Sequence, residues 1–447
     1  MRRHVLAIRR GMTLVEMLVA MAASLLLMAA IARAFAAFSG AMSNSRAILE
    51  TDARLRSAAH RLRTDLQGAT TQMLPPRNPA QGEGYFEVIE GPLTDYQDST
   101  APAAPVAIVS GTTEVCPTDI DDVLLFTTRN TDTPFIGRGP GPAPFDQFES
   151  SVAEVAWFAR ATPGTTGPVT YTLYRKQLLV MGYVGGGPFA SDNQRTWPGS
   201  WENYYALPCD ISARRERRLT SPTFDRIVPN NLSDLTRREN RFLHNSTGDT
   251  TGNNFPYPFV AHQTGTPDGL TFDGTIREGE DIVLTNVLAF DVRVFDPAAA
   301  VGDSGTTANV PGDPGFSSGG AGSGAYVDLG HGFASNPLLA SPTIPAYFAN
   351  VTSQVGSASD LLTRTYCTWS THYEANGLDE DGDSLTDEGT DGLDNLPANS
   401  LVDDDAEQET SPPYPYPLRG IEVRIRVYEP SSRQVRQVTV RQTFVPH

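Results

Sequence analysis

The chain has 447 residues, which leaves room for one large domain or two ordinary ones. It carries 52 acidic residues against 34 lysines and arginines, a net charge of -18. Because binding to nucleic-acid phosphates needs a basic surface, this balance argues against nucleic acid as a direct partner. Three cysteines, Cys116, Cys209 and Cys367, are too few for a disulfide framework, although one pair could form in an oxidising compartment.

A short basic segment precedes a long apolar run at the N-terminus. The run from Met17 to Ala32 carries no charged residue, and apolar residues also precede Glu16. The whole stretch approaches the ~20 residues that a helix needs to cross a bilayer. A cleavable secretory signal peptide has a similar pattern. The acidic Glu16 inside the stretch and the helical pattern after it favour a membrane helix that is retained.

The basic residues before the apolar run predict its orientation. Arg2, Arg3, Arg9 and Arg10 lie before the run, and no comparable cluster follows until Arg46. The positive-inside tendency predicts a single pass with a cytoplasmic N-terminus and an exported remainder.

The segment from Arg9 to Glu16, followed by the apolar run, resembles the processing site of type IV prepilins and type II secretion pseudopilins. The resemblance implies a leader at 1–11, cut between Gly11 and Met12 by a prepilin peptidase that also methylates the Met12 amine. It further implies that Glu16 pairs with the N-terminal amine of a neighbouring subunit during filament assembly. Otherwise a lone carboxylate in lipid would be protonated or reach toward water.

The helical pattern continues beyond the apolar run and becomes amphipathic. Apolar residues recur at intervals of seven and four, with charged residues, Asp65 among them, off that line. The recurring residues are Ile48, Leu55, Leu62, Leu66 and Met73. Pro75 and Pro76 then stop the pattern, because proline lacks the amide donor. The sequence predicts one helix over 12–74, with about 12–35 in the membrane and the second half packed on a domain of the same chain.

The remainder, 75–447, is predicted to be rich in β-strands. Short runs of β-branched and aromatic residues, separated by turn residues, are typical of strands. They are Val106–Ser110, Asp122–Arg129, Ser151–Phe158, Val169–Arg175, Asn286–Phe295, and a closing hairpin from Ile421 to Val445. In the fifth run, Leu288, Phe290, Val292 and Val294 alternate onto one face. A long helix followed by an antiparallel sheet is an α+β, pilin-like architecture.

The order of the strands narrows the resemblance. The third and fourth runs are predicted to form a hairpin. Its Leu-Tyr-Arg at 173–175 and the closing arginine-rich hairpin are similar to the J-type minor pseudopilins and the PilW-like minor pilins. That resemblance implies a place near the filament tip, with other pilins or pseudopilins as partners. The stretches at about 185–278 and 297–324 are predicted to be loop insertions, the second rich in glycine, serine and proline.

An acidic loop at 376–409 has the spacing of a calcium site. Carboxylates alternate with other residues, and Gly382 permits a tight turn. The candidate ligands are Asp379, Asp381, Asp383, Asp387 and Glu388. The pattern resembles calcium loops of the dockerin, thrombospondin and excalibur type, but it lacks the EF-hand glycine and final glutamate, having Ser384 and Thr390 there. A solvated, self-repelling acidic loop is the alternative.

No catalytic motif is present in the sequence, and the seven histidines have no ligand spacing. We therefore expect a non-enzymatic subunit of a type II secretion pseudopilus or a type IV pilus, with calcium as a structural ion. A calcium-dependent adhesion or binding protein on a pilin-like anchor is the competing hypothesis.

Overall fold

The structure is a computed structural model of the chain. The residues that it describes are 13–73, 82–90, 107–108, 115–116, 119–120, 122–139, 146–161, 170–182, 210–217, 225–236, 240–242, 281–303, 308–310, 320–329, 365–368, 389–390, 408–409 and 418–444.

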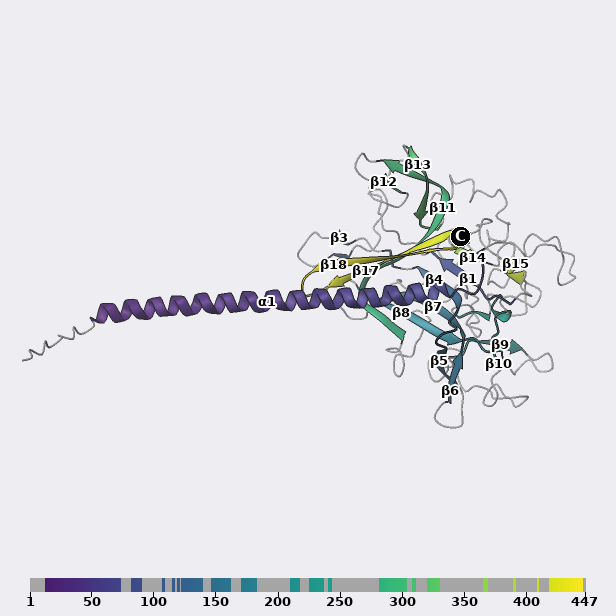
Figure 1. The fold of residues 1–447 in the computed structure, drawn as a ribbon, viewed down its shortest axis with the longest axis horizontal. Helices are drawn as coiled ribbons and strands as arrows, with labels where there is room; N and C mark the ends of the chain where they lie inside the picture. Colours follow the sequence, from purple (N-terminus) through teal and green to yellow (C-terminus); the bar gives the residue numbers. More distant parts are fainter. Residues whose placement is uncertain are drawn as a thin grey trace, which may run out of the picture. The chain divides into compact units, whose positions relative to one another are not determined.

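One long helix, α1 (Leu14–Gln67), follows the N-terminal segment (Figure 1). The described chain divides into two compact units, and α1 contributes to both. The first unit holds α1 up to Ala53 together with the turn Glu429–Gln434. Within it, the Thr51 hydroxyl donates to Glu429 Oε2 at 2.7 Å. The second unit holds the last part of α1, from Arg54, and the β-sheet.

The predicted extent of the helix, 12–74, was too long at its C-terminal end, because α1 ends at Gln67. Ala69 N still donates to Leu66 O at 3.2 Å, but other backbone hydrogen bonds here join this segment to a strand. Arg129 N donates to Gly68 O at 2.7 Å, and Thr70 N donates to Thr127 O at 3.0 Å. These tertiary hydrogen bonds end the helix before the two prolines are reached.

The second unit is built on one antiparallel sheet with the order β14-β1-β4-β7-β8-β11-β17-β18. Its strands are β1 (Phe86–Ile89), β4 (Val123–Arg129), β7 (Val152–Ala161), β8 (Tyr171–Leu179), β11 (Ile282–Asp303), β14 (Thr365–Cys367), β17 (Gly420–Glu429) and β18 (Gln434–Thr443). Two further strands, β12 (Ala308–Asn309) and β13 (Gly320–Val327), pair with β11 off this path. The α+β, pilin-like class is therefore confirmed.

Smaller pairs lie outside the main sheet. They are β2 (Ala107–Ile108) with β3 (Val115–Cys116), β5 (Phe135–Gly139) with β6 (Asp146–Ser150), β9 (Ala213–Arg217) with β10 (Asp225–Pro229), and β15 (Gly389–Thr390) with β16 (Gln408–Glu409). A short 3-10 helix, η3 (Asp234–Thr236), follows β10. The β9–β10 pair lies within the predicted insertion at 185–278.

The predicted hairpins are present in the main sheet. β7 and β8 pair antiparallel from Ala153↔Leu179 to Ala161↔Tyr171. β17 and β18 are neighbours at the edge of the sheet. In the second hairpin, β17 has the clearest alternation, and its Ile421, Val423 and Ile425 are buried. Period-two alternation therefore identified these strands correctly.

The loop predicted at 297–324 was wrong at both ends. β11 continues through Pro297 to Asp303, and β13 begins at Gly320 and pairs with it. The register shifts between Asp296 and Ala300, so a β-bulge accommodates the exposed proline, which has no amide to donate. Gly324 has a φ of 97°, which a residue with a side chain rarely adopts.

A second bulge changes which residues of β11 share a face. The register shifts between Val287 and Ala289, and Asn286 has a φ of 58°. As a result Val287, rather than the predicted Leu288, belongs to the core cluster with Phe290 and Val292, although Leu288 is also buried.

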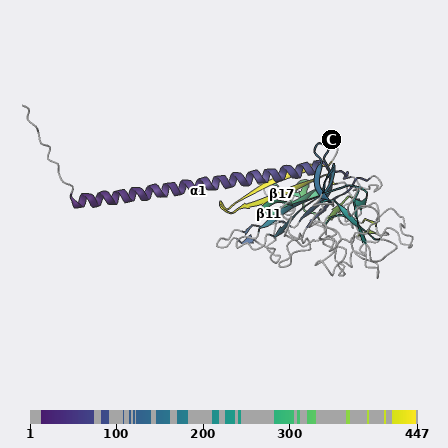
Figure 2. The ribbon, with the colours of Figure 1, turned by 90° about the horizontal axis from the view of Figure 1, so that it is seen from below.

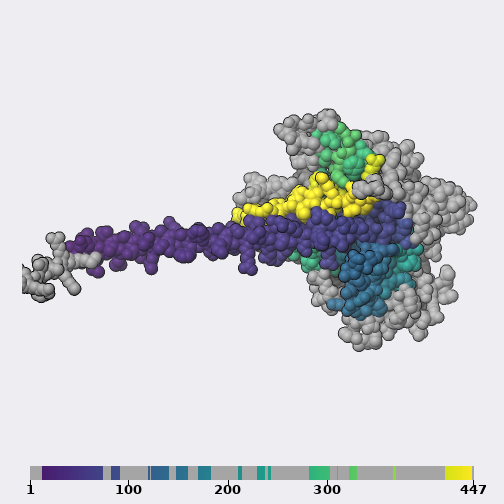
Figure 3. Space-filling view, in the orientation of Figure 1, coloured from purple at the N-terminus to yellow at the C-terminus, as the bar shows by residue number. Residues whose placement is uncertain are grey.

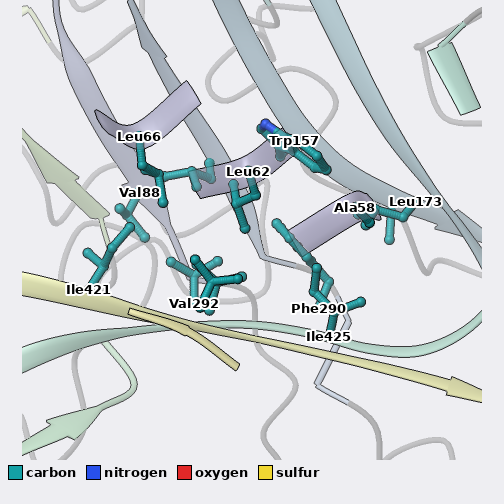
Figure 4. Packing of buried hydrophobic residues seen from close by; sticks show 14 of the residues in the cluster. Ala58, Leu62, Leu66, Val88, Trp157, Leu173, Phe290, Val292, Ile421 and Ile425 are labelled. Atoms are coloured by element: carbon teal, nitrogen blue, oxygen red, sulfur yellow. The ribbon is translucent and has the colours of Figure 1, made fainter. Parts of the chain in front are cut away.

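The last part of α1 covers one face of this sheet (Figure 2). Leu55, Leu62 and Leu66 are buried against residues of the central strands. Figure 4 shows Leu62 between Trp157 of β7 and Val292 of β11, with Ile425 of β17 close by. The second half of the predicted helix therefore has a partner surface in the same chain.

Candidate functional site

The first part of α1 is apolar and exposed. Fifteen of its large hydrophobic side chains are exposed, and contact of these side chains with water is unfavourable. The most exposed include Leu14, Leu26, Met28, Phe35 and Met42. An 18-residue stretch of α1 is strongly apolar, and none of it is buried. Figure 3 shows this part of α1 as the purple stretch. The helix is long and apolar enough to cross a membrane, which fits a single-pass anchor.

Glu16 forms a capping box at the start of this helix. Its Oε2 accepts hydrogen bonds from Thr13 N at 2.8 Å and from the Thr13 hydroxyl at 3.0 Å. In return Glu16 N donates to Thr13 Oγ1 at 3.3 Å. This reciprocal pattern satisfies amides that a helix start leaves unpaired. Within a single chain, Thr13 is thus a partner of Glu16 that the sequence reasoning missed, whereas Gly11 and Met12 lie outside the described residues.

Asp65 fixes the last part of α1 to the sheet. Arg175 of β8 donates to both of its carboxylate oxygens at 2.7 Å, and Trp157 Nε1 donates to Oδ2 at 3.0 Å. The Thr128 hydroxyl donates to the Asp65 backbone oxygen at 2.7 Å. The fork of an arginine matches a carboxylate in this two-bond geometry. The residue that we predicted on the polar side of the helix is therefore buried and anchors it.

A second buried carboxylate, Glu154 of β7, is also fully engaged. Its Oε1 accepts from the Tyr85 hydroxyl at 2.7 Å and from Phe242 N at 2.8 Å, and its Oε2 accepts from the Ser212 hydroxyl at 2.5 Å. Burial, followed by the nearby Glu154 charge, raises the pKa of Tyr85 well above its usual range. This tyrosine therefore stays a neutral donor, and the network ties the β9–β10 region to the sheet.

Cys367 is a free, buried thiol. It accepts a contact at 3.2 Å from Arg241, whose guanidinium also donates to Glu87 at 3.0 Å. The cysteine is thus part of a buried polar cluster between β1 and β14.

The predicted calcium ligands of the acidic loop, Asp379, Asp381, Asp383, Asp387 and Glu388, lie outside the described residues. The strands on either side of part of that loop are described. β15 pairs with β16 in parallel, Gly389 beside Gln408 and Thr390 beside Glu409.

Comparison with known proteins gives one match. The search of curated proteins finds no significant similarity, and neither does the search of solved structures. Residues 7–32 match the family model of the prokaryotic N-terminal methylation motif. The matched segment contains Gly11, Met12 and Glu16 and covers the exposed apolar start of α1. The chain carries the N-terminal methylation motif, and this supports a protein of the type IV pilin and pseudopilin class that a prepilin peptidase processes.

Proposed function

We propose that the chain is a structural minor pseudopilin or minor pilin, cut between Gly11 and Met12 and assembled into a type II secretion pseudopilus or a type IV pilus. The observation that carries this proposal is the division of α1 into an exposed apolar part and a part buried on the sheet. An exposed apolar helix needs a lipid or protein environment, and the methylation motif at its start supports a filament subunit.

In the proposed mechanism the chain works by packing rather than by catalysis. In the inner membrane, the exposed part of α1 is covered by lipid. In the filament, the same side chains contact the helices of other pilins or pseudopilins, so the apolar surface exchanges one partner for another. Glu16 then leaves Thr13 and pairs with the N-terminal amine of the neighbouring subunit, which sets the register.

The sheet unit faces outward in this proposal. We propose that it lies in the periplasm while the chain is in the membrane, and near the tip once assembled, as its resemblance to J-type and PilW-like minor subunits implies. Calcium bound by Asp379, Asp381, Asp383, Asp387 and Glu388 would order the acidic loop, because an ion offsets the repulsion among its carboxylates.

Two substitutions test the proposal in cells that carry the chain and its filament machinery. Gly11→Val is expected to remain at the unprocessed mass and to be absent from sheared filaments. Glu16→Val is expected to be processed but lost from filaments, because the cleavage site is intact and the register contact is not. Processing is measured by intact mass, and assembly by immunoblotting of the sheared fraction.

Matched controls separate these effects from damage to the helix. Gly40→Ala changes a glycine of the same helix at which an added Cβ has no neighbour within 4 Å. Thr13→Val removes the capping partner and leaves the Glu16 charge. Both are expected to be processed and assembled. Recovery of Gly11→Val in filaments at the wild-type level would contradict the proposal, and intact filaments with lost surface binding on deletion would favour the adhesion hypothesis.

A further inference from the structure

Five acidic side chains meet in the interior of the sheet unit. Glu90 follows β1, Asp119 and Asp122 lie before or at the start of β4, Asp291 lies on β11, and Asp328 follows β13. Each is at most 5% exposed. They come from segments far apart in the sequence, and a hydrogen bond of 2.8 Å from Phe290 N to Asp119 O joins two of these segments directly.

Their carboxylate oxygens are close enough to share a cation. One oxygen each from Glu90, Asp119 and Asp328 lie within 4.8 Å of one another, and the same holds for Asp119, Asp122 and Asp291. Calcium binds oxygens at about 2.3–2.6 Å, so two ligands of one ion are separated by at most about 5 Å. Asp119 belongs to both groups and is therefore the centre of the cluster.

Asp119 differs from the other buried carboxylates that anchor this unit. Asp65 and Glu154 accept hydrogen bonds on both oxygens. Both oxygens of Asp119 are buried and have no hydrogen-bond partner within the described chain. A buried carboxylate without such bonds is costly, and native proteins rarely leave one. The two oxygens of Asp119 accept no hydrogen bond from the described residues and lie close to other carboxylates. This arrangement indicates that a cation belongs between them.

The charges around Asp119 lead to the same conclusion. The carboxylates of Asp122 and Glu90 lie close to that of Asp119. Arg293 contacts the flanks of the cluster, at 3.0 Å from Asp291 and 3.2 Å from Asp328. No arginine or lysine forms an ion pair with Asp119 in the described part of the chain.

We propose that Asp119, Glu90 and Asp328 bind one calcium ion inside the sheet unit. All of the side-chain ligands are carboxylate oxygens, which suit a hard cation better than zinc or copper. We choose this group over the other because Asp122 Oδ2 accepts from Val292 N at 2.6 Å and Asp291 accepts from Arg293 with both oxygens, whereas Glu90 Oε2 accepts from Leu329 N at the longer distance of 3.3 Å. The site is separate from the acidic loop and does not depend on the filament assignment.

The ion would hold the sheet unit together at a specific place. It would join the ends of β1 and β13 to the segment before β4, strands that are not neighbours in the sheet except for β1 and β4. Binding to the native state alone stabilises a protein by mass action. The sheet unit is therefore expected to be calcium-stabilised.

The test compares calcium-dependent thermal unfolding of three full-length proteins in detergent, each first stripped with a chelator. They are the wild type, Asp119→Asn, and the double variant Asp381→Asn/Asp383→Asn in the acidic loop. Calcium chloride at about a hundredfold excess over Kd is expected to raise the midpoint of the wild type and of the loop variant by roughly 5 °C. Asp119→Asn, which is nearly isosteric, is expected to lose this rise and to keep only what calcium bound by the acidic loop contributes.

The opposite outcomes overturn the proposal. If Asp119→Asn responds to calcium as the wild type does, or if the loop variant loses the whole response, the buried site does not bind the ion. If calcium shifts none of the three proteins, Asp119 is held as a neutral acid. Should Asp119→Asn fail to fold, Glu90→Gln replaces it, and metal content by mass spectrometry decides. A loop variant that retains about one calcium per chain after desalting supports the site, and one that retains none refutes it.

Discussion

Buried ionisable side chains in the sheet unit are held by partners far away in the sequence. Asp65 on α1 meets Arg175, which is 110 residues further along the chain, and both side chains are almost fully buried. Two such charges are stable together only because each satisfies the other. The ion pair between Asp65 and Arg175 therefore holds the end of the helix on the sheet.

Replacing Asp65 by asparagine is expected to destabilise the protein by about 3–5 kcal/mol, because it leaves the Arg175 charge buried without a counter-charge. Unfolding of the full chain in detergent, followed by tryptophan fluorescence, measures this. Arg56→Gln on an exposed position of the same helix is the control, expected within about 0.5 kcal/mol of wild type.

A double variant, Asp65→Asn/Arg175→Met, sharpens this test. It removes both charges, and part of the lost stability is expected to return. Equal stability of Asp65→Asn and Arg56→Gln would show that the ion pair does not hold the helix.

At the scale of elements, the sequence predicted the strands with an alternating face and missed features that depend on distant contacts. Ile421, Val423 and Ile425 alternate with charged residues along β17, and that pattern is local. The end of α1 is not local, since it is set where Gly68 meets Arg129. Pro297 is typical of a loop in the sequence. The β-bulge that lets it lie within a strand forms only when β13 pairs with β11.

The close packing around Gly68 leads to a prediction at the scale of elements. A Cβ at Gly68 would collide with the Arg129 backbone oxygen and the Thr128 hydroxyl. Gly68→Ala is therefore expected to cost about 1–3 kcal/mol of unfolding free energy, by overpacking. Gly40→Ala, with open space around the new methyl group, is expected to gain about 0.5–1 kcal/mol through helix propensity. Chemical denaturation of both variants measures the difference, and an equal effect at the two glycines would rule out the close packing at Gly68.

The candidate sites were predictable to different degrees. The roles of Gly11 and Glu16 stay predictions, which the sequence allows because the processing motif is contiguous, whereas Thr13 was not recognised as the capping partner of Glu16. The cluster around Asp119 could not be predicted, because Glu90, Asp119 and Asp328 are isolated acids in the sequence and converge only in the folded sheet.

At the scale of the whole molecule, each of the two units has its own physical role. One unit contains the exposed apolar helix, and the other contains the sheet with the buried end of α1. This division fits a subunit that is anchored by one part and presents the other. It also makes processing at Gly11 the central claim, because every later step in the proposal starts from a mature Met12.

Intact-mass analysis with N-terminal sequencing of the chain purified from membranes tests that claim most directly. We predict a chain that begins at N-methylated Met12 and retains the whole of α1. A chain that begins at Met1 in cells with an active prepilin peptidase, or one cut after the apolar run, would contradict the account.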